Sequence, residues 1–313
     1  MKKPGMIFVR WANRCNNNCE MCSLHSDDSR DESMSFEEAA EFTIKNIDEY
    51  SNIEFTGGEP TIKEGLLELV ALAKKTGYDK ICISTNGRRL SDENFCHALA
   101  ENGLNVVTFA LHGHNAETHE RMSRVIGSFE ESMEGIKNVL NEPTMALAIT
   151  SVLSRHNHET FSEIGKMLIE MGVKQWSISD LIPDGRAQDI YDSLSLSPSE
   201  MGKSLAEAIP LFPGFYQVGI FNFSRCFFPE ELYRNVAFFD TKAKADLWDI
   251  EGKEGRYEKE GEVYHDFHKT YLGICEKCPA YETCGGVWKR SLELYGPSEM
   301  EKIARVNGFV ETV

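Results

Sequence analysis

Short apolar runs alternate with longer amphipathic segments between residues 7 and 182. The apolar runs have the length and composition of β-strands. We expect strands at residues 7–9, 53–55, 80–84, 106–111, 145–152 and 175–182. The intervening segments have helical length, and helix signals mark their ends, such as the capping-box pattern of Ser35 and Glu38 and the terminal Gly77. We expect helices at residues 35–50, 64–76, 91–102, 116–122, 128–141 and 157–171, with Ser91 as the N-cap of the third.

Strands that alternate with helices in this way predict βα units and a parallel sheet. Right-handed crossovers would wind six such units into a curved sheet, and six units are too few for a closed eight-stranded barrel. We therefore expect an α/β fold in which residues 1–187 form a (βα)6 partial barrel. Ligands of parallel α/β sheets bind at the carboxyl ends of the strands, so polar residues that follow strand ends are candidate site residues.

The pattern changes from residue 188 onward. Ser197-Pro198-Ser199-Glu200 has the features of a helix start. Beyond Ile209 the chain contains prolines and aromatic residues without a clean period, and the charged residues 242–262 predict a solvated loop. We expect residues 188–313 to form a linker helix and a smaller C-terminal domain.

Composition and charge narrow the classes of partner. The chain contains no run of 18 apolar residues and no secretory signal pattern, which predicts a cytoplasmic protein without a membrane partner. The formal net charge of −17 opposes binding to a nucleic-acid backbone. We therefore expect no nucleic-acid partner, although Arg10 and Arg14 could form a local basic patch.

The nine cysteines favour metal binding over disulfide bonds in a chain without a secretory signal. Cys82 and Cys96 lie in an expected strand and an expected helix, and we interpret both as core thiols. The other seven form two groups, one of Cys15, Cys19 and Cys22 and one of Cys226, Cys275, Cys278 and Cys284.

The first group has C-x3-C-x2-C spacing directly after an expected strand. Three thiolates on one short loop can hold three corners of a four-iron cluster and leave one iron open. The alternative is a zinc site, but structural zinc takes four ligands that usually come as separated pairs. The spacing therefore favours an iron–sulfur cluster.

This spacing resembles the motif of the radical S-adenosylmethionine (SAM) superfamily, with Met21 at the apolar position before the last cysteine. Thr56-Gly57-Gly58-Glu59-Pro60 resembles the second landmark of that superfamily. The resemblance covers residues 6–185. It implies SAM on the open iron, reductive cleavage to a 5′-deoxyadenosyl radical, hydrogen abstraction from a substrate, and an external electron donor of flavodoxin or ferredoxin type.

The resemblance also implies which residues contact SAM. Arg124 would pair with the SAM carboxylate through its bidentate fork, although it falls one place later than the arginine of the family and Ser123 is in register. His112 would face the substrate or cap a strand end, and Ser84 is equally plausible as a turn residue. The full set of expected SAM-site residues is Met21, Thr56, Gly57, Gly58, Glu59, Ser84, Asn86, His112, Arg124 and Ser151.

The second cysteine group resembles a shortened SPASM domain, the twitch form, which holds one auxiliary four-iron cluster. Cys226, Cys275, Cys278 and Cys284 would ligate it fully, and the chain would then hold two four-iron clusters. A four-cysteine zinc site is the alternative. If Cys226 is a core thiol instead, one iron stays open for substrate. The full SPASM pattern has a further cysteine where this chain has Trp288.

The leading hypothesis is a radical SAM enzyme that acts on a peptide or protein substrate, because the second cysteine group resembles that of peptide maturases. The first alternative is the same chemistry on a small metabolite or cofactor precursor. We expect no separate peptide-binding domain ahead of the first strand, which weakens the leading hypothesis without removing it. A non-catalytic iron–sulfur electron carrier ranks last. No side chain is assigned a catalytic role.

Overall fold

The computed structural model describes residues 3–29, 34–229, 232, 236–239, 246–248 and 268–309. The chain divides into two compact units. The first comprises Met1–Leu111, Asn115–Ile149 and Ala245–Lys259, and the second comprises His112–His114, Thr150–Lys244 and Glu260–Val313. This division does not fall at the predicted domain boundary after residue 187, which stays a prediction.

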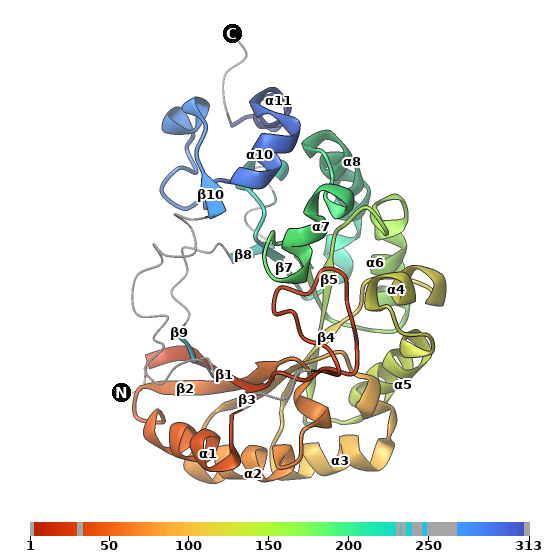
Figure 1. Ribbon diagram of the computed structural model, residues 1–313, viewed down its shortest axis with the longest axis vertical. Helices are drawn as coiled ribbons and strands as arrows, with labels where there is room; N and C mark the ends of the chain where they lie inside the picture. The colour runs from red at the N-terminus through yellow and green to blue at the C-terminus, as the bar shows by residue number, and fades with distance from the viewer. Residues whose placement is uncertain are drawn as a thin grey trace. The chain divides into compact units, whose positions relative to one another are not determined.

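The first unit is built on a parallel sheet with the strand order β4-β3-β2-β1-β9. Helices α1, α2 and α3 lie along this sheet (Figure 1). Its strands are β1 Lys3–Ala12, β2 Tyr50–Gly57, β3 Lys80–Thr85, β4 Val106–Ala110 and β9 Asp246–Trp248, and its helices are α1 Phe36–Lys45, α2 Leu66–Thr76, α3 Glu93–Asn102, α4 Ala116–Ser123 and α5 Ser128–Asn141. Strand β5, Ala146–Val152, runs from the first unit into the second.

The second unit contains the parallel strands β6, β7 and β8 and a short antiparallel pair, β10 and β11. The strands are β6 Gln175–Ser179, β7 Gln217–Phe221, β8 Val236–Phe239, β10 Lys269–Thr270 and β11 Val287–Trp288. The helices are α6 Phe161–Glu170, α7 Arg186–Leu194, α8 Pro198–Ala208, α10 Lys289–Tyr295 and α11 Pro297–Val306. Parallel strands joined through helices confirm the predicted α/β class.

Alternation along the strands explains which side chains form the core. Ile7 and Val9 of β1 and Ile53 and Phe55 of β2 are fully buried, whereas the residues between them are partly exposed on the other face of the sheet. Burial of four large apolar side chains, at roughly 1.5–3 kcal/mol each, favours this register strongly. A shift by one residue would bring the polar positions into the core.

Several sequence expectations hold and others need correction. The capping box of Ser35 and Glu38 is present, but the helix ends at Lys45 because Tyr50 already begins β2. Ser91 is not an N-cap. It ends the short 3-10 helix Arg88–Ser91, and Asp92 caps α3 through its carboxylate.

The strands after residue 209 were not expected. Strand β7 has Val218 and Ile220 almost fully buried, but Gly219 between them is buried too, so the segment lacks the alternation that marks a half-buried strand. The expected loop at residues 242–262 is wrong for residues 246–248, which form β9 beside β1. The rest of that expected loop lies outside the described residues. Within the described part of the chain, every helix is too short or too polar to cross a membrane.

Candidate functional site

The cysteine loop follows β1 directly and has neither helix nor strand up to residue 29. Its shape therefore depends on contacts with other segments. The main-chain nitrogen of Asn18 donates to the oxygen of Ser123 at 3.1 Å, and that of Glu20 donates to the oxygen of Met122 at 3.1 Å. The end of α4 thus holds the middle of the loop, and the predicted Met21 follows these contacts as a buried side chain.

The Cys15 thiol lies in surroundings that suit a metal ligand. Its Sγ accepts hydrogen bonds from the Asn17 main-chain nitrogen at 3.4 Å and from Nδ2 of Asn86 at 3.8 Å. Burial, followed by the nearby Glu59 carboxylate, raises the pKa of the Cys15 thiol to about 12. A bound cation would offset both effects, because metal ligation deprotonates a thiol. Cys19 and Cys22 are half-buried on the same loop.

Gly57 and Gly58 let two main-chain segments touch. Gly57 has φ of 129°, and a Cβ there would lie 1.9 Å from the oxygen of Ala12. A Cβ on Gly58 would lie 2.3 Å from the oxygen of Arg14. These glycines approach the end of β1 and Arg14 just before Cys15, and their predicted approach to SAM stays a prediction. Thr56 precedes them, paired with Arg10 of β1.

Glu59 connects this turn to the end of β3. The side chain is fully buried. Its Oε1 accepts from N and Oγ1 of Thr61 at 3.0 and 2.6 Å and from Oγ1 of Thr85 at 2.6 Å, and its Oε2 accepts from N of Asn86 at 2.7 Å. Burial raises the pKa of Glu59, and these hydrogen bonds oppose the rise. Its carboxylate is therefore occupied by protein donors, and its contact with SAM stays a prediction.

Asn86 and Ser84 also have protein partners. Nδ2 of Asn86 donates to Oδ1 of Asn16 at 2.7 Å, which ties β3 to the cysteine loop. Ser84 Oγ donates to the Glu54 carboxylate, whose pKa is raised by burial. Asn86 therefore organises the loop, and the predicted contacts of both residues with SAM remain untested.

Arg124 lies beside the cysteine loop. It is the C-cap of α4 with φ of 58°, and its Nε is 3.7 Å from Oε1 of Glu20. The side chain is 47% exposed, so this long ion pair leaves the guanidinium available to a ligand. Arg121, one turn earlier on α4, is exposed. This placement supports the choice of Arg124, which stays a prediction.

His112 and Ser151 belong to the second unit. Nδ1 of His112 accepts from the main-chain nitrogen of Val152 at 3.2 Å. The main-chain oxygen of His112 accepts from Nδ2 of Asn157 at 2.8 Å, as expected of a strand-end cap. Ser151 shares the buried face of β5 with Ile149, and its Oγ accepts from Nε1 of Trp176 at 3.1 Å. Both contacts favour a structural role, and the predicted cofactor contacts remain untested.

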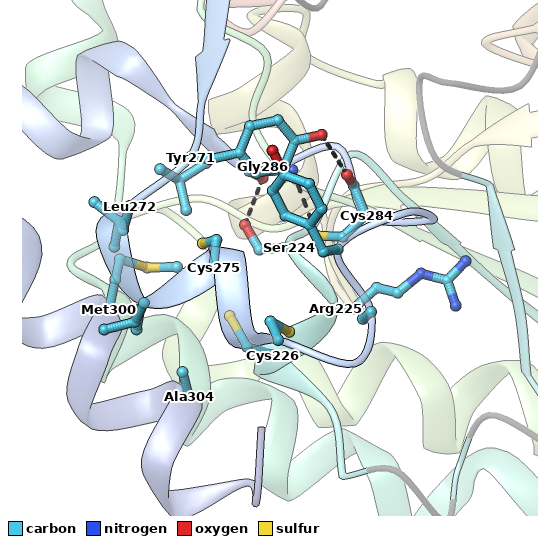
Figure 2. Close-up of a pocket in the computed structure, with 15 residues that line it drawn as sticks. Ser224, Arg225, Cys226, Tyr271, Leu272, Cys275, Cys284, Gly286, Met300 and Ala304 are labelled. Carbon is cyan, nitrogen blue, oxygen red and sulfur yellow. Dashed lines mark hydrogen bonds between the residues drawn. The ribbon is translucent and has the colours of Figure 1, made fainter. Parts of the chain in front are cut away.

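The four cysteines of the second group line one pocket of the second unit. Figure 2 shows Cys226, Cys275 and Cys284 around it. Burial, followed by the neighbouring thiols, raises the pKa of Cys226 strongly. The Sγ of Cys284 accepts from N of Gly286 at 3.4 Å. Among the described residues, no three His, Cys, Asp or Glu side chains are close enough to hold a single metal ion.

Two residues of interest were missed from the sequence. Arg88 donates to the cysteine loop, and the basic pair that it forms with Arg89 after a turn was a usable signal. Asp180 is buried at the end of β6, and burial raises its pKa to about 7. A lone aspartate after an apolar strand gave no signal of burial.

The family model of the radical SAM superfamily matches residues 9–168, which include the first cysteine group and the Gly-Gly-Glu-Pro turn. The chain belongs to the radical SAM superfamily. It is therefore a radical SAM enzyme, and the family implies a four-iron cluster and SAM. The superfamily part of the resemblance is confirmed, whereas the SPASM or twitch assignment is not.

Similar proteins have diverse substrates. The chain is 29% identical over 192 residues to the AdoMet-dependent heme synthase of Oleidesulfovibrio alaskensis, covering 60% of this chain and 48% of the relative. It is 28% identical over 173 residues to a probable GTP 3′,8-cyclase of Saccharolobus islandicus, covering 55% of each. The chain thus spans about half the length of these curated relatives.

Solved structures share the fold over nearly the whole chain. anSMEcpe with bound AdoMet superposes with a TM-score of 0.66 at 17% identity, covering 98% of this chain and 97% of that one. Streptococcus suis SuiB bound to the precursor peptide SuiA gives 0.62 at 12% identity, covering 92% and 72%. The fold is the curled parallel half-barrel of the radical SAM family, which confirms the predicted partial barrel.

Proposed function

We propose that this radical SAM enzyme abstracts a hydrogen atom from a peptide or protein substrate. Cys15, Cys19 and Cys22 would hold the SAM-binding cluster. When bound, the cluster and SAM supply reductive cleavage to a 5′-deoxyadenosyl radical. The observation that carries the proposal is the four-thiol pocket of the second unit, because four thiols that line one pocket could hold a second cluster in addition to that of the family core.

The auxiliary site is proposed as a four-iron cluster rather than a zinc ion. Its four thiols share one pocket but are not gathered around a single point, as zinc would require. A cluster places each thiolate on a different iron and so suits a wider ring of sulfurs. Apolar residues such as Ala280 and Ala304 pack against this pocket and would exclude water from it.

The substrate class rests on full-length likeness in fold. The likeness to anSMEcpe covers nearly all of both chains, and that protein has been solved with the peptides Cp18Cys and Kp18Cys. The second candidate is a small metabolite or cofactor precursor, which the heme synthase and GTP cyclase names favour. A flavodoxin- or ferredoxin-type protein would donate the electron in either case.

Metal and SAM chemistry are tested first. Anaerobic reconstitution should give about eight iron atoms per chain, and a Cys15→Ala/Cys19→Ala/Cys22→Ala variant should keep about four and lose deoxyadenosine formation. Cys275→Ala/Cys278→Ala is the matched control, which should lose the auxiliary iron and keep SAM cleavage in part. One zinc in place of the auxiliary iron would refute the second cluster, and deoxyadenosine from the triple variant would refute the SAM site.

The substrate class is tested by stimulation of deoxyadenosine formation. Extract from the source organism is split into a macromolecular fraction and a small-molecule filtrate. We expect stimulation by the macromolecular fraction, abolished when that fraction is first digested to amino acids. Stimulation by the filtrate alone, unaffected by protease, would refute the peptide proposal and support the small-molecule candidate.

A further inference from the structure

Arg88 is placed next to the cysteine loop by a turn that only glycine allows. It follows Gly87, which has φ of 78° and ends the turn after β3. A Cβ on Gly87 would lie 1.6 Å from Cε1 of Phe109. The turn therefore fixes where the chain leaves β3 and where the side chain of Arg88 begins.

The Arg88 guanidinium contacts two consecutive residues between Cys15 and Cys19. Its Nη1 donates to the main-chain oxygen of Asn16 at 2.5 Å and to Oδ1 of Asn17 at 3.0 Å. The side chain is only 15% exposed, so water competes little for these bonds. A planar fork with several fixed N–H groups can make such contacts together, whereas a lysine cannot reproduce their geometry.

A third contact holds the guanidinium from the other side. Nε of Arg88 donates to Oε2 of Glu131 on α5 at 2.5 Å. Glu131 is 46% exposed, so solvent screens its charge more than that of Arg88. The positive charge of Arg88 therefore outweighs the negative charge of Glu131 on the side that faces the cysteine loop.

We propose that Arg88 is a positioning residue for the SAM-binding cluster, one that fixes the Cys15–Cys19 segment and raises the reduction potential of the cluster. The inference rests on the proposed function, because it needs a cluster on that loop. Addition of an electron makes a cluster more negative, and a fixed cation nearby stabilises the reduced state. Charges and hydrogen bonds around a metal centre tune its potential in this way.

The test uses the full chain after anaerobic reconstitution. The iron content of each variant is measured first. The midpoint potential of the first cluster, without SAM, is then followed by electron paramagnetic resonance. To isolate that cluster, every variant carries Cys275→Ala/Cys278→Ala. Arg88→Met removes the charge, Arg88→Lys keeps the charge without the fork, and Glu131→Gln removes the opposing charge. We expect Arg88→Met to lower the equilibrium constant for reduction of the cluster about tenfold, which lowers its midpoint potential by about 59 mV for one electron.

The two controls separate the effect of Arg88 on the structure of the Cys15–Cys19 segment from the effect of its charge on the potential. Arg88→Lys should load less iron than the parent and keep most of its potential, because the charge remains while the fork is lost. Glu131→Gln should load normally and raise the potential, a shift opposite to that of Arg88→Met. A purely structural role for Arg88 would not produce this opposition.

Each remaining outcome is decisive. A parent protein without iron at the first loop would refute the proposed function and, with it, this inference, which needs a cluster on that loop. A loaded parent whose iron content and potential are unchanged in Arg88→Met would overturn the inference. If Arg88→Met loads no iron, an unchanged or lower potential in Glu131→Gln would overturn the electrostatic part. Weaker SAM binding in Arg88→Met with an unchanged potential would assign Arg88 to SAM instead.

Discussion

Glu59→Gln tests whether one buried carboxylate organises the loops around the cysteine motif. The carboxylate accepts four hydrogen bonds, three at Oε1 and one, from N of Asn86, at Oε2. A glutamine whose oxygen keeps the first three places its NH2 group against the N–H of Asn86, so two donors meet. A buried donor left without an acceptor costs about 1–3 kcal/mol.

Burial of a charge works in the opposite direction, because the neutral glutamine avoids the desolvation that raises the pKa of Glu59. This relief offsets part of the penalty, and we expect the free energy of unfolding still to fall, by no more than about 1–3 kcal/mol. Glu54→Gln is the matched control. Glu54 accepts from Ser84 alone among the described side chains, and a glutamine oxygen can accept the same bond, so the loss should stay below about 1 kcal/mol.

Anaerobic urea unfolding of the two metal-free variants and the wild type measures both effects, with the denaturant slope checked for equality. Equal losses in the two variants would contradict the view that Glu59 organises the loops. A Glu59→Gln midpoint within error of the wild type would contradict it as well. A shared change in slope would instead indicate an altered unfolded state.

Two further predictions concern single charged residues. Arg124→Ala should weaken SAM binding by about 1.5–3 kcal/mol and Arg121→Ala by less, because Arg124 lies against the cysteine loop. Equilibrium binding of SAM to the reconstituted protein measures both losses. Equal losses would show that the choice of Arg124 is wrong. Burial raises the pKa of Asp180 from 3.8 to about 7, so the folded state binds this proton more tightly than the unfolded state. Its contribution to stability is therefore complete below about pH 4 and is lost as the pH rises through about 7, by at most about 4 kcal/mol. Asp180→Asn should remove that dependence in urea unfolding at several pH values, and a wild-type slope in the variant would contradict the assignment.

Local patterns predicted the elements that local forces determine. The alternation of Ile53 and Phe55 with polar neighbours, and the capping box at Ser35, each depend on a few adjacent residues, and both were found correctly. Strand β7 was missed because its apolar run is short, includes Gly219 and follows a segment of prolines and aromatics. Its identity as a strand comes from pairing with β6 and β8, which sequence spacing does not encode.

The candidate site shows the same limit. Cysteine spacing alone indicated a candidate metal loop, because Cys15, Cys19 and Cys22 lie within eight residues, and metal ligation there stays a prediction. The basic pair at Arg88 was visible in the sequence, but its contact with the loop was not, since Arg88 reaches Asn16 across 72 positions. The contact of Glu59 with SAM stays a prediction, whereas the hydrogen bonds that its carboxylate accepts from Thr85 and Asn86 at the end of β3 became visible only in the fold. Motifs thus revealed which residues could be ligands, and the contacts that orient those ligands required the fold.

Trp288 bears on how many clusters the second unit could hold. In the resemblance to a SPASM domain, it takes the place of a further cysteine, and it is 3% exposed on β11. Its Nε1 donates to Oδ2 of Asp180 at 2.9 Å, and the ammonium of Lys269 lies 4.4 Å from its ring centroid. A buried carboxylate stabilised by an indole and an ammonium is a satisfied polar cluster. This position therefore joins β11 to the end of β6 by packing and hydrogen bonding, which limits the proposed auxiliary chemistry to the four-thiol pocket.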